Sequence, residues 1–494
     1  MKLTILGGVA ALALVAACTE SGEADLTGTS VEALASGTVL PNLLAIPNSS
    51  GWSATVSTTG GIDLGNPYFQ NLGTNGRRCV SCHLPTAGWS VTPPQLREIF
   101  DATLGGTLDD SAGLGAIFRT NDGANSPTAD VSTLAHRKLA YSMLLNRGLI
   151  RVGLPIPANA EFELVDVDDP YHFASASQLS LFRRPLPVAN DGFLTTVMWD
   201  GRETVPGATI ASDLETQANS ATVGHAQGIP LGTADRVDIR AFEQTLFFAQ
   251  VYDYGAGKLD SNGAAGGPTN LSQQGFHVGV NDNFGDCIDA DNTGCRVIGA
   301  PLGSGTRGAP FTSIIFNLYN AWTDTQSGPS YQVTNRRAVA RGQALFNTLP
   351  ITISGVSGLN DEAAFGAPPS LVGTCGTCHD TPNVGHHSVV APLNLGLTDE
   401  SRRTADMPLY TLRNKTTGET KKTTDPGRAL ITGKWKHIGR FKGPILRGLA
   451  ARAPYFHNGF AANLDEVIDL YNDRFNMKLS TQQHSDLVAF LRTL

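Results

Sequence analysis

Two copies of the motif Cys-x-x-Cys-His constrain this chain more than any other feature of its sequence. The first runs from Cys79 to His83 and the second from Cys375 to His379. Two thiols at this spacing can form thioethers with the vinyl groups of one porphyrin, and the adjacent imidazole can ligate its iron. A zinc site or a redox dithiol would use the thiols but would leave both histidines unexplained. The motifs therefore predict two covalently bound c-type haems, with these attachment and proximal iron-binding residues: Cys79, Cys82, His83, Cys375, Cys378 and His379.

The N-terminus has the pattern of an export signal. Lys2 precedes an apolar run from Leu3 to Ala17, which is shorter than the roughly 20 residues of a membrane-spanning helix. The run ends in Ala-Ala-Cys, which resembles a bacterial lipobox, so we expect a signal peptide over 1–17 and acylation of Cys18. An ordinary signal peptide with an incidental cysteine is the alternative. Thr19 follows the cysteine, which favours an outer-membrane lipoprotein facing the periplasm, and 18–60 is expected to be a flexible tether.

Two further cysteines, Cys287 and Cys295, stand in a short Asp- and Asn-rich segment. In an exported protein we expect them to form a disulfide. The same segment has the partial spacing of a calcium-binding loop, although Ala300 stands where a closing glutamate is expected. Calcium is therefore left open here as an alternative.

Composition limits the classes of protein that fit. The 494 residues carry a net charge of −8 without a basic block, so we expect no nucleic-acid partner. The 54 glycines and 27 prolines indicate a loop-rich chain. No segment after the N-terminus is long and apolar enough to span a bilayer.

Similar segments precede the two motifs: Gly65 to Phe69 before the first, and Arg341 to Phe346 before the second. Each has a glycine followed by an aromatic residue, which is how small cytochrome c domains begin. We expect a mainly α protein with little β, made of two cytochrome-c-like haem domains packed together: 61–235, which reacts with peroxide, and 336–494, which transfers electrons. A loop-rich insertion is expected over 236–335. Helices are predicted at 134–149, 239–252, 336–346, 464–471 and 481–494.

The chain resembles the bacterial di-haem cytochrome c peroxidase superfamily, which includes MauG and the haem-containing rubber oxygenases. The resemblance depends on both haem motifs, on the string Trp-Asp-Gly-Arg at 199–202, and on the segment 441–460 with Pro-Tyr-Phe-His-Asn-Gly. It implies two facing haems, of which the His83 haem reacts with peroxide and the other stores or relays electrons.

The resemblance also implies roles for single residues. Trp199 would relay electrons between the haems. The distal ligand of the second haem would be Tyr471, with Met477 as the runner-up, and a phenolate there would stabilise ferric iron. Supporting roles near the haems are expected for Arg202, Arg447 and His457.

The distal pocket of the first haem departs from the family pattern. Gln217 matches a family glutamine, but Gln227 stands at the position of the expected glutamate, and His225 lies two residues before it. These three residues are the candidates for the distal pocket. The position of a family ligand for interdomain calcium is occupied by Arg184, whose positive charge disfavours calcium. His386 and His387 are expected in an exposed loop.

The resemblance implies an enzyme that reduces hydrogen peroxide with electrons from a small periplasmic redox protein, a cytochrome c or a cupredoxin. Three alternatives stay open: a MauG-like oxidase of a protein or peptide, a dioxygenase of the rubber-oxygenase kind, and a non-enzymatic electron-transfer cytochrome. Two haems c are the expected cofactors, with calcium doubtful. The chain would meet the membrane only through its lipid anchor, and a homodimer is compatible with the resemblance.

Overall fold

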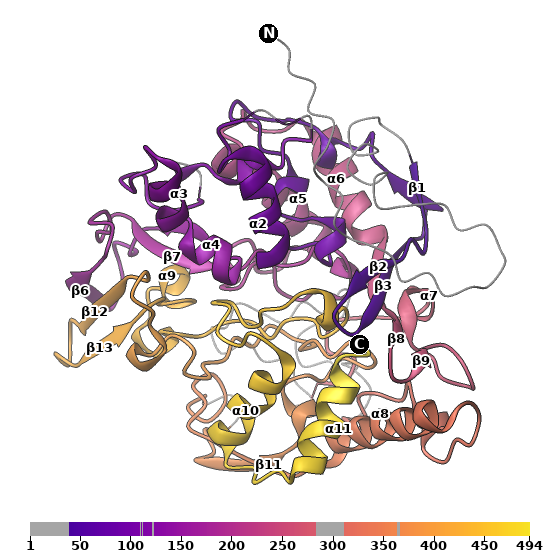
Figure 1. The fold of residues 1–494 in the computed structure, drawn as a ribbon. Helices are drawn as coiled ribbons and strands as arrows, with labels where there is room; N and C mark the ends of the chain where they lie inside the picture. Colours follow the sequence, from indigo (N-terminus) through magenta and orange to yellow (C-terminus); the bar gives the residue numbers. More distant parts are fainter. Residues whose placement is uncertain (1–38, 109, 111, 121–122, 283–310, 363–365) are drawn as a thin grey trace.

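The two Cys-x-x-Cys-His motifs lie in different lobes of the molecule. The computed structural model describes residues 39–494 except 109, 111, 121–122, 283–310 and 363–365. In Figure 1 most of the chain before residue 250 forms the upper lobe, and most of the chain after 310 forms the lower lobe. The first motif packs against a core of upper-lobe side chains, and the second against a core built mainly from lower-lobe helices. The predicted signal peptide over 1–17, Cys18, Cys287 and Cys295 lie outside the described residues.

Helices occur in both lobes. Their bounds are α2 Pro93–Thr103, α3 Leu134–Ala140, α4 Ser142–Arg147, α5 Ile210–His225, α6 Thr233–Thr245, α7 Gly267–Leu271, α8 Ser330–Thr348, α9 Ala429–Thr432, α10 Leu464–Phe475 and α11 Thr481–Leu491.

Strands form several small sheets around these helices. Their bounds are β1 Val39–Pro41, β2 Ile46–Asn48, β3 Gly51–Ser57, β4 Gly61–Asp63, β5 Ile150–Leu154, β6 Phe162–Asp168, β7 Leu179–Arg183, β8 Leu246–Asp253, β9 Gly257–Lys258, β10 Ile351–Ser354, β11 Ser370–Gly373, β12 Leu409–Asn414 and β13 Thr420–Thr423. The largest sheet has the order β2-β3-β8-β9. With 32% helix and 18% strand, the fold is more mixed than the mainly α prediction with little β.

Strand β8 shows why part of a helix prediction is wrong. The predicted helix over 239–252 is helical only to Thr245, the last residue of α6, and continues as β8. The segment from Leu246 to Tyr252 is rich in aromatic residues, which favour strands. It pairs antiparallel with β3, with Thr55 opposite Phe248. Pairing with a distant strand therefore outweighs the local helical pattern.

Strands β1, β2 and β3 lie within the segment 18–60, for which a flexible tether is predicted. Most residues of β3 are buried, and the strand pairs antiparallel with β2 and β8. Trp89 donates its indole hydrogen bond to Thr55 of this strand, at 2.9 Å. The start of the described chain is therefore part of the upper-lobe core.

The other predicted helices are present with different bounds. The predicted helix over 134–149 is divided at Tyr141 into α3 and α4, while α8 and α10 extend beyond 336–346 and 464–471. Helix α11 ends before the predicted 494. None of the described helices is long and apolar enough to cross a membrane.

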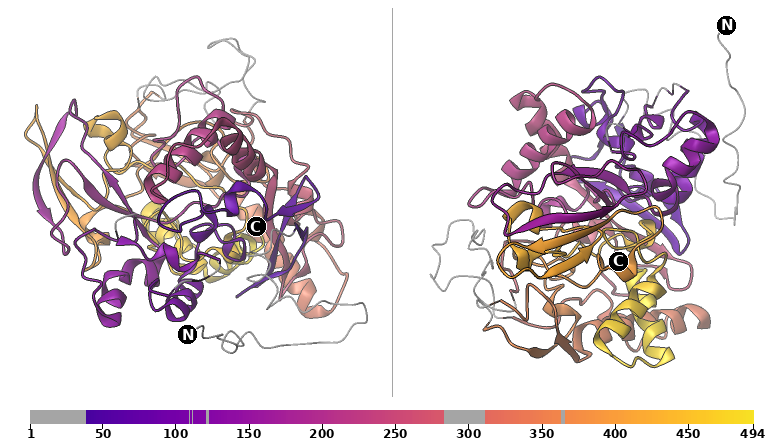
Figure 2. Two further views of the ribbon diagram at one scale, coloured as in Figure 1. Left: turned by 90° about the horizontal axis from the view of Figure 1, so that it is seen from above. Right: turned by 90° about the vertical axis from the view of Figure 1, so that its left-hand side faces the viewer.

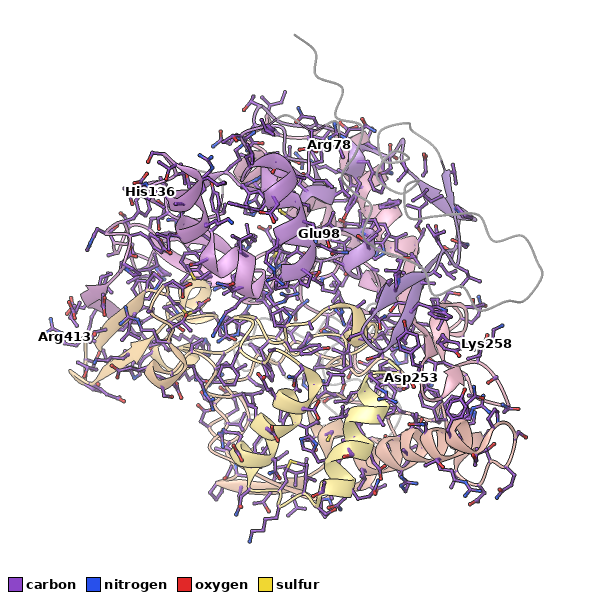
Figure 3. The ribbon with its side chains drawn as sticks, in the orientation of Figure 1. Arg78, Glu98, His136, Asp253, Lys258 and Arg413 are labelled. Atoms are coloured by element: carbon purple, nitrogen blue, oxygen red, sulfur yellow. The ribbon has the colours of Figure 1, made fainter. Side chains whose placement is uncertain are left out.

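The lobes are joined by strands and by buried polar contacts. Strand β6 of the upper lobe pairs with β12, which pairs with β13, at the left edge of Figure 1. On the other side, the Arg492 guanidinium pairs with Asp253 at 2.7 Å, and Figure 3 shows Asp253 beside α11. Figure 2 shows the same arrangement of ribbons from two further directions. The sites described below therefore lie in one packed body.

Candidate functional site

The two motifs form the same local structure. Each begins with a 3-10 turn, Cys79–Ser81 in the first motif and Cys375–Thr377 in the second. In both, the amide of the histidine donates to the carbonyl of the first cysteine at 3.1 Å. This turn holds the two thiols and the imidazole close together, which is the arrangement that one porphyrin needs for two thioethers and one iron ligand.

The histidine rings are oriented by backbone carbonyls. Nδ1 of His379 lies 2.8 Å from the carbonyl of Gly385, and Nδ1 of His83 lies 3.4 Å from that of Trp89. A ring that donates through Nδ1 keeps Nε2 free for a metal. Burial lowers the pKa of His83 to about 4 and also lowers the pKa of His379, so both rings are neutral, which is the form that binds iron.

The motif cysteines are reduced thiols with raised pKa values. Burial raises the pKa of Cys79, Cys375 and Cys378 to about 12 and also raises that of Cys82. Redox dithiols and zinc ligands act as thiolates, which burial disfavours here. Two thiols beside a neutral imidazole are compatible with covalent attachment of a porphyrin.

A cavity of mostly apolar lining lies against the first motif. It contains about 1420 Å³ of space free of atoms, part of it open to solvent. Its walls include Cys79, Cys82 and His83 on one side and helix α5 on another. The size, the apolar walls and the imidazole fit a haem.

Helix α5 presents two of the three candidate distal residues to this cavity. Thr209 caps the helix by accepting a hydrogen bond from the amide of Ser212 at 3.2 Å. Gln217, Ala221 and His225 follow at intervals of four residues, which places them on one face, and all three line the cavity.

Gln227 is not among the described residues that line this cavity. It follows the end of α5 with a φ of 52°, and its carbonyl accepts a hydrogen bond from Thr74 at 3.0 Å. The register of the helix therefore separates Gln227 from Gln217 and His225.

A second cavity lies against the second motif, with about 1550 Å³ of space free of atoms, part of it open to solvent. Helix α10 supplies Val467, Tyr471 and Phe475 to its wall at intervals of four residues, and Met477 lines it just beyond the helix. The Tyr471 ring lies 6.2 Å from the Phe475 ring, and burial raises the pKa of its phenol. Both candidate distal ligands, Tyr471 and Met477, thus face the cavity that contains His379.

Trp199 belongs to the walls of both cavities, as do Lys442 and Pro444. Its indole donates to the carbonyl of Arg184 at 2.8 Å, and its own carbonyl accepts from the amide of Lys442 at 2.9 Å. The ring meets His457 edge to face, with centroids 6.1 Å apart. His457 also lines the second cavity and stacks on Phe441 at 3.9 Å. An aromatic bridge, Trp199 with His457, therefore lies where the cavities adjoin.

The two candidate supporting arginines differ in position. Arg202 lines the first cavity and pairs with Asp200 at 3.2 Å. Arg447 lines neither cavity. Its buried guanidinium donates to three backbone carbonyls, those of Leu494, Asn383 and Gly267.

Two buried carboxyl groups that sequence reasoning did not single out line the first cavity, Asp191 and Glu243. Burial raises the pKa of Asp191 to about 7 and raises that of Glu243 further, with Asp191 adding to the shift. Burial also lowers the pKa of the neighbouring Lys442 to about 8. The signal for Glu243 was present in the sequence, because a charged residue interrupts the apolar face of α6 beside Ile239 and Phe242.

The expectation of an exposed loop at His386 and His387 is wrong. Both are buried, and His387 lies 3.0 Å from Asp380, whose other oxygen accepts from the amide of Ser388 at 2.6 Å. The segment folds back after the second motif, with the amide of Thr381 bonded to the carbonyl of His386 at 2.8 Å. Polar composition indicated solvent exposure, whereas both side chains are buried near His379 and His387 is paired with Asp380.

Across the described ranges, no three or more His, Cys, Asp or Glu side chains are grouped so that they could hold a metal ion. The segment with Cys287 and Cys295, for which calcium is the alternative to a disulfide, lies outside those ranges.

Sequence comparison finds relatives named cytochrome-c peroxidase. The chain is 30% identical over 141 residues to cytochrome-c peroxidase IdrP1 of Pseudomonas sp. strain SCT, which is 24% of this chain and 36% of that protein. It is 32% identical over 140 residues to IdrP1 of Denitromonas iodatirespirans, again 24% and 36% of the two chains. With cytochrome c551 peroxidase of Nitrosomonas europaea the identity is 36% over 69 residues, 14% and 21% of the chains. The match thus spans little more than a third of the first two relatives.

No family model matches the chain. Among solved structures, a MauG-like protein associated with microbial copper homeostasis aligns with a TM-score of 0.30 and 18% identity, over 65% of this chain and 76% of that one. The sequence matches support the resemblance that the motifs predict: over about a quarter of its length the chain is similar to proteins named cytochrome-c peroxidase.

Proposed function

We propose that this chain is a di-haem c oxidoreductase of the peroxidase type, which reduces hydrogen peroxide with electrons from a small redox protein. The observation that carries the proposal is the shared wall of the two motif cavities, formed by Trp199, Lys442 and Pro444. Two redox groups that face one aromatic side chain can exchange electrons, whereas two isolated haem sites would not need such a wall. The alignments span only 36% of the length of the first two relatives, so peroxidase activity of this chain is a proposal.

His83 and His379 would hold the two haem irons, and the four motif cysteines would hold the porphyrins. A bound haem would supply a redox-active iron that can accept and donate single electrons and react with peroxide. The neutral state of both imidazoles and their carbonyl-bonded Nδ1 atoms support this assignment.

Gln217 and His225 would act on peroxide from the face opposite His83. The amide of Gln217 can donate a hydrogen bond to a peroxide oxygen and orient it. An imidazole can carry a proton from one oxygen to the other, which is the work of a general acid and base. Trp199 and His457 would form the path between the cavities.

The proposal includes export. A chain with the signal at 1–17 and a lipid on Cys18 would be held at the outer membrane, facing the periplasm. A periplasmic cytochrome c or cupredoxin would then be the electron donor, and a homodimer remains part of the expectation.

A second candidate, a MauG-like oxidase of a protein or peptide, is favoured by one observation. Tyr471 lines the second cavity together with Phe456 and Phe475, and the rings of both lie 6.2 Å from its own. A tyrosine ligand stabilises ferric iron and favours storage of oxidising equivalents over rapid turnover. Met477 lines the same cavity and would favour the peroxidase.

Stopped-flow optical spectroscopy with one equivalent of hydrogen peroxide tests the proposal, first on the oxidised and then on the half-reduced holoprotein. We expect a fast absorbance change, followed by turnover when reduced cytochrome c is added. A long-lived oxidised species without donor turnover would favour the MauG-like oxidase. Absence of a change in both redox states would overturn both candidates and leave an electron carrier.

Replacement of Trp199 by Phe tests the shared wall. The variant should keep the optical reaction at the first haem and should slow the arrival of the second oxidising equivalent at the other haem. Trp435→Phe is the matched control, because Trp435 packs in a separate core cluster and lines neither cavity. Equal behaviour of the two variants would contradict a relay through Trp199.

A further inference from the structure

We propose that Arg184 is a positioning residue whose buried guanidinium fixes the aromatic bridge between the two haem cavities, in place of a bound metal ion. The inference rests on the proposed function only in its consequence for electron transfer. Its structural part concerns how the bridge is held.

Arg184 is buried and donates to three backbone carbonyls. Nη1 donates to Arg147 at 2.8 Å, and Nη2 donates to Val91 at 2.7 Å and to Arg452 at 3.0 Å. The first two carbonyls belong to the upper lobe, at the end of α4 and just before α2, whereas the third comes from the segment between Phe441 and Phe460. One planar group therefore joins three segments that are far apart in sequence.

No carboxylate accompanies this charge. None of the ion pairs found between described residues includes Arg184. Burial and the neighbouring Arg452 lower its pKa to about 9, which leaves it positively charged at neutral pH. Burying a charge without an opposite charge costs folding free energy unless oriented dipoles stabilise it. Here the three backbone carbonyls that accept from the guanidinium provide such dipoles.

The backbone of the same residue holds both rings of the bridge. The Arg184 carbonyl accepts the indole hydrogen bond of Trp199 at 2.8 Å, and the Arg184 amide donates to the carbonyl of His457 at 2.7 Å. The guanidinium fixes the peptide, and the peptide fixes the two aromatic residues. Loss of the guanidinium should therefore loosen Trp199 and His457 together.

The same geometry argues against calcium at this place. Calcium takes six to eight oxygen ligands, among them backbone carbonyls. Here the carbonyls are already bonded to a cation that the chain itself supplies, and a second positive charge would be repelled. The residues present do not fit a metal ion. Instead, the Arg184 guanidinium binds the carbonyls that a metal ion would otherwise ligate.

Arg184 lines the first cavity, but its guanidinium is closely packed on the side of Gly148. A Cβ at Gly148 would lie 2.5 Å from Nη1 of Arg184, and Gly148 has a φ of 65°. Even one added methyl group would displace the guanidinium, which shows how tightly the three carbonyls and the neighbouring backbone define its place.

The test compares three variants of the full-length holoprotein: Arg184→Met, Arg184→Lys and the control Arg447→Met. Arg447 is matched to Arg184 in its burial and in its three main-chain oxygen acceptors. It differs from Arg184 in position, because Arg184 lines the first cavity and Arg447 lines neither cavity. Both Met variants should lower Tm. Hydrogen exchange at the amides of residues 184 and 442, which bond to His457 and Trp199, should rise on the order of tenfold in Arg184→Met and stay unchanged in the control.

Arg184→Lys keeps the positive charge but loses the planar guanidinium with its several N–H donors. Hydrogen exchange at the two amides in this variant should therefore lie between that of the wild type and that of Arg184→Met. This variant keeps the test informative if Arg184→Met does not fold. Electron equilibration between the haems should slow in the same order as exchange rises. Treatment of the wild type with a calcium chelator, or addition of calcium, should leave both Tm and exchange as they were.

Unchanged exchange in Arg184→Met and Arg184→Lys, or a chelator effect that reproduces theirs, would overturn the inference. Exchange and chelator measurements do not depend on peroxide chemistry. A protein that fails to react with peroxide but shows the expected exchange would refute the proposed function and leave the positioning role of Arg184 intact.

Discussion

Buried ionisable side chains give the first cavity a capacity to exchange protons, which its apolar walls lack. Asp191 and Glu243 line it together with Lys442, and each has a pKa shifted toward its neutral form by burial. Groups with pKa values near neutrality can hold and release protons at physiological pH. The cavity therefore contains proton reservoirs in addition to the distal candidates on α5.

Asp191 should make stability depend on pH. Its pKa is about 7 in the folded chain, against an ordinary 3.8. Between these values the folded state binds more protons, so the free energy of unfolding should fall as pH rises from about 4 to about 7, by up to about 4 kcal/mol. Asp191→Asn should flatten this slope, as measured by denaturant titrations at several pH values. An unchanged slope would mean that the carboxylate is ionised in the folded chain.

The two glutamines should differ in their effect on the reaction with peroxide. Gln217 lines the first cavity and Gln227 does not. Removing a hydrogen-bond donor that faces a developing charge typically costs about 10²-fold in rate, so Gln217→Leu should slow the stopped-flow reaction with peroxide by that order. Gln227→Leu serves as the control and should react like the wild type. Equal loss in both variants would contradict the placement of the distal pocket on α5.

At the level of residues, the sequence was most informative where covalent chemistry fixes the spacing. The motifs predict His83 and His379 as iron ligands, which stays a prediction, and the helical register explains why Gln217 and His225 share a cavity. Burial of Asp191 and His387 depends on chain segments that are distant in sequence, so no local pattern could have revealed it. The interruption of the apolar face of α6 by Glu243 was the one signal available.

At the level of elements, a buried ion network joins β7 to the lower lobe. Arg183, the last residue of β7, pairs with Asp200 at 2.5 Å and with Asp425 at 2.7 Å, and all three side chains are buried. Asp200 follows the bridging Trp199, and its pKa is lowered by the two arginines beside it. The acidic residue of Trp-Asp-Gly-Arg thus anchors the turn that carries Trp199.

Arg183→Met should be among the most destabilising substitutions in this region. It leaves Asp200 and Asp425 buried without their shared partner, which typically costs about 3–5 kcal/mol. Asp200→Asn keeps a hydrogen-bond acceptor for Arg183 and should cost less, about 1–3 kcal/mol. Denaturant midpoints of the two variants check the order. If Asp200→Asn were the more damaging, Arg202 and not Arg183 would be its principal partner.

Elements were predictable where their pattern is local. Helix α10 shows this, because the asparagine cap at Asn463 and the apolar spacing lie within its own sequence. Strand β8 was not predictable, since its pairing with β3 joins segments about 200 residues apart. The strands of the described N-terminal segment were missed for the same reason.

At the level of the whole molecule, each lobe has a motif, a cavity and a helix that closes the cavity, α5 above and α10 below. The two helices occupy similar places relative to the two motifs, whereas the division into two haem domains stays a prediction. Their sequences do not resemble each other, which explains why only the motifs and the short segments before them indicated a duplication.

Removal of one haem attachment site should separate the reaction with peroxide from electron transfer through the second haem. Cys375→Ser/Cys378→Ser should carry one haem per chain and should lower Tm by at least about 3 °C, because a mostly apolar cavity loses the ligand that binds only the folded state. Intact-protein mass spectrometry and pyridine haemochrome spectra check the haem count. Cys79→Ser/Cys82→Ser is the converse variant, and it alone should abolish the fast reaction with peroxide. A wild-type chain with a single haem would contradict the assignment.

The shared wall of the cavities has a thermodynamic consequence. Lys442 and Trp199 contribute atoms to both sites, so a ligand or a charge that shifts them at one site changes the binding free energy at the other. Linkage makes such an effect symmetric: if reduction at the His379 site alters the affinity of the His83 site for an axial ligand by some factor, binding of that ligand must alter the reduction equilibrium by the same factor. The two haem sites would then be thermodynamically coupled, so that the redox or ligand state of one site changes the ligand affinity or reduction potential of the other.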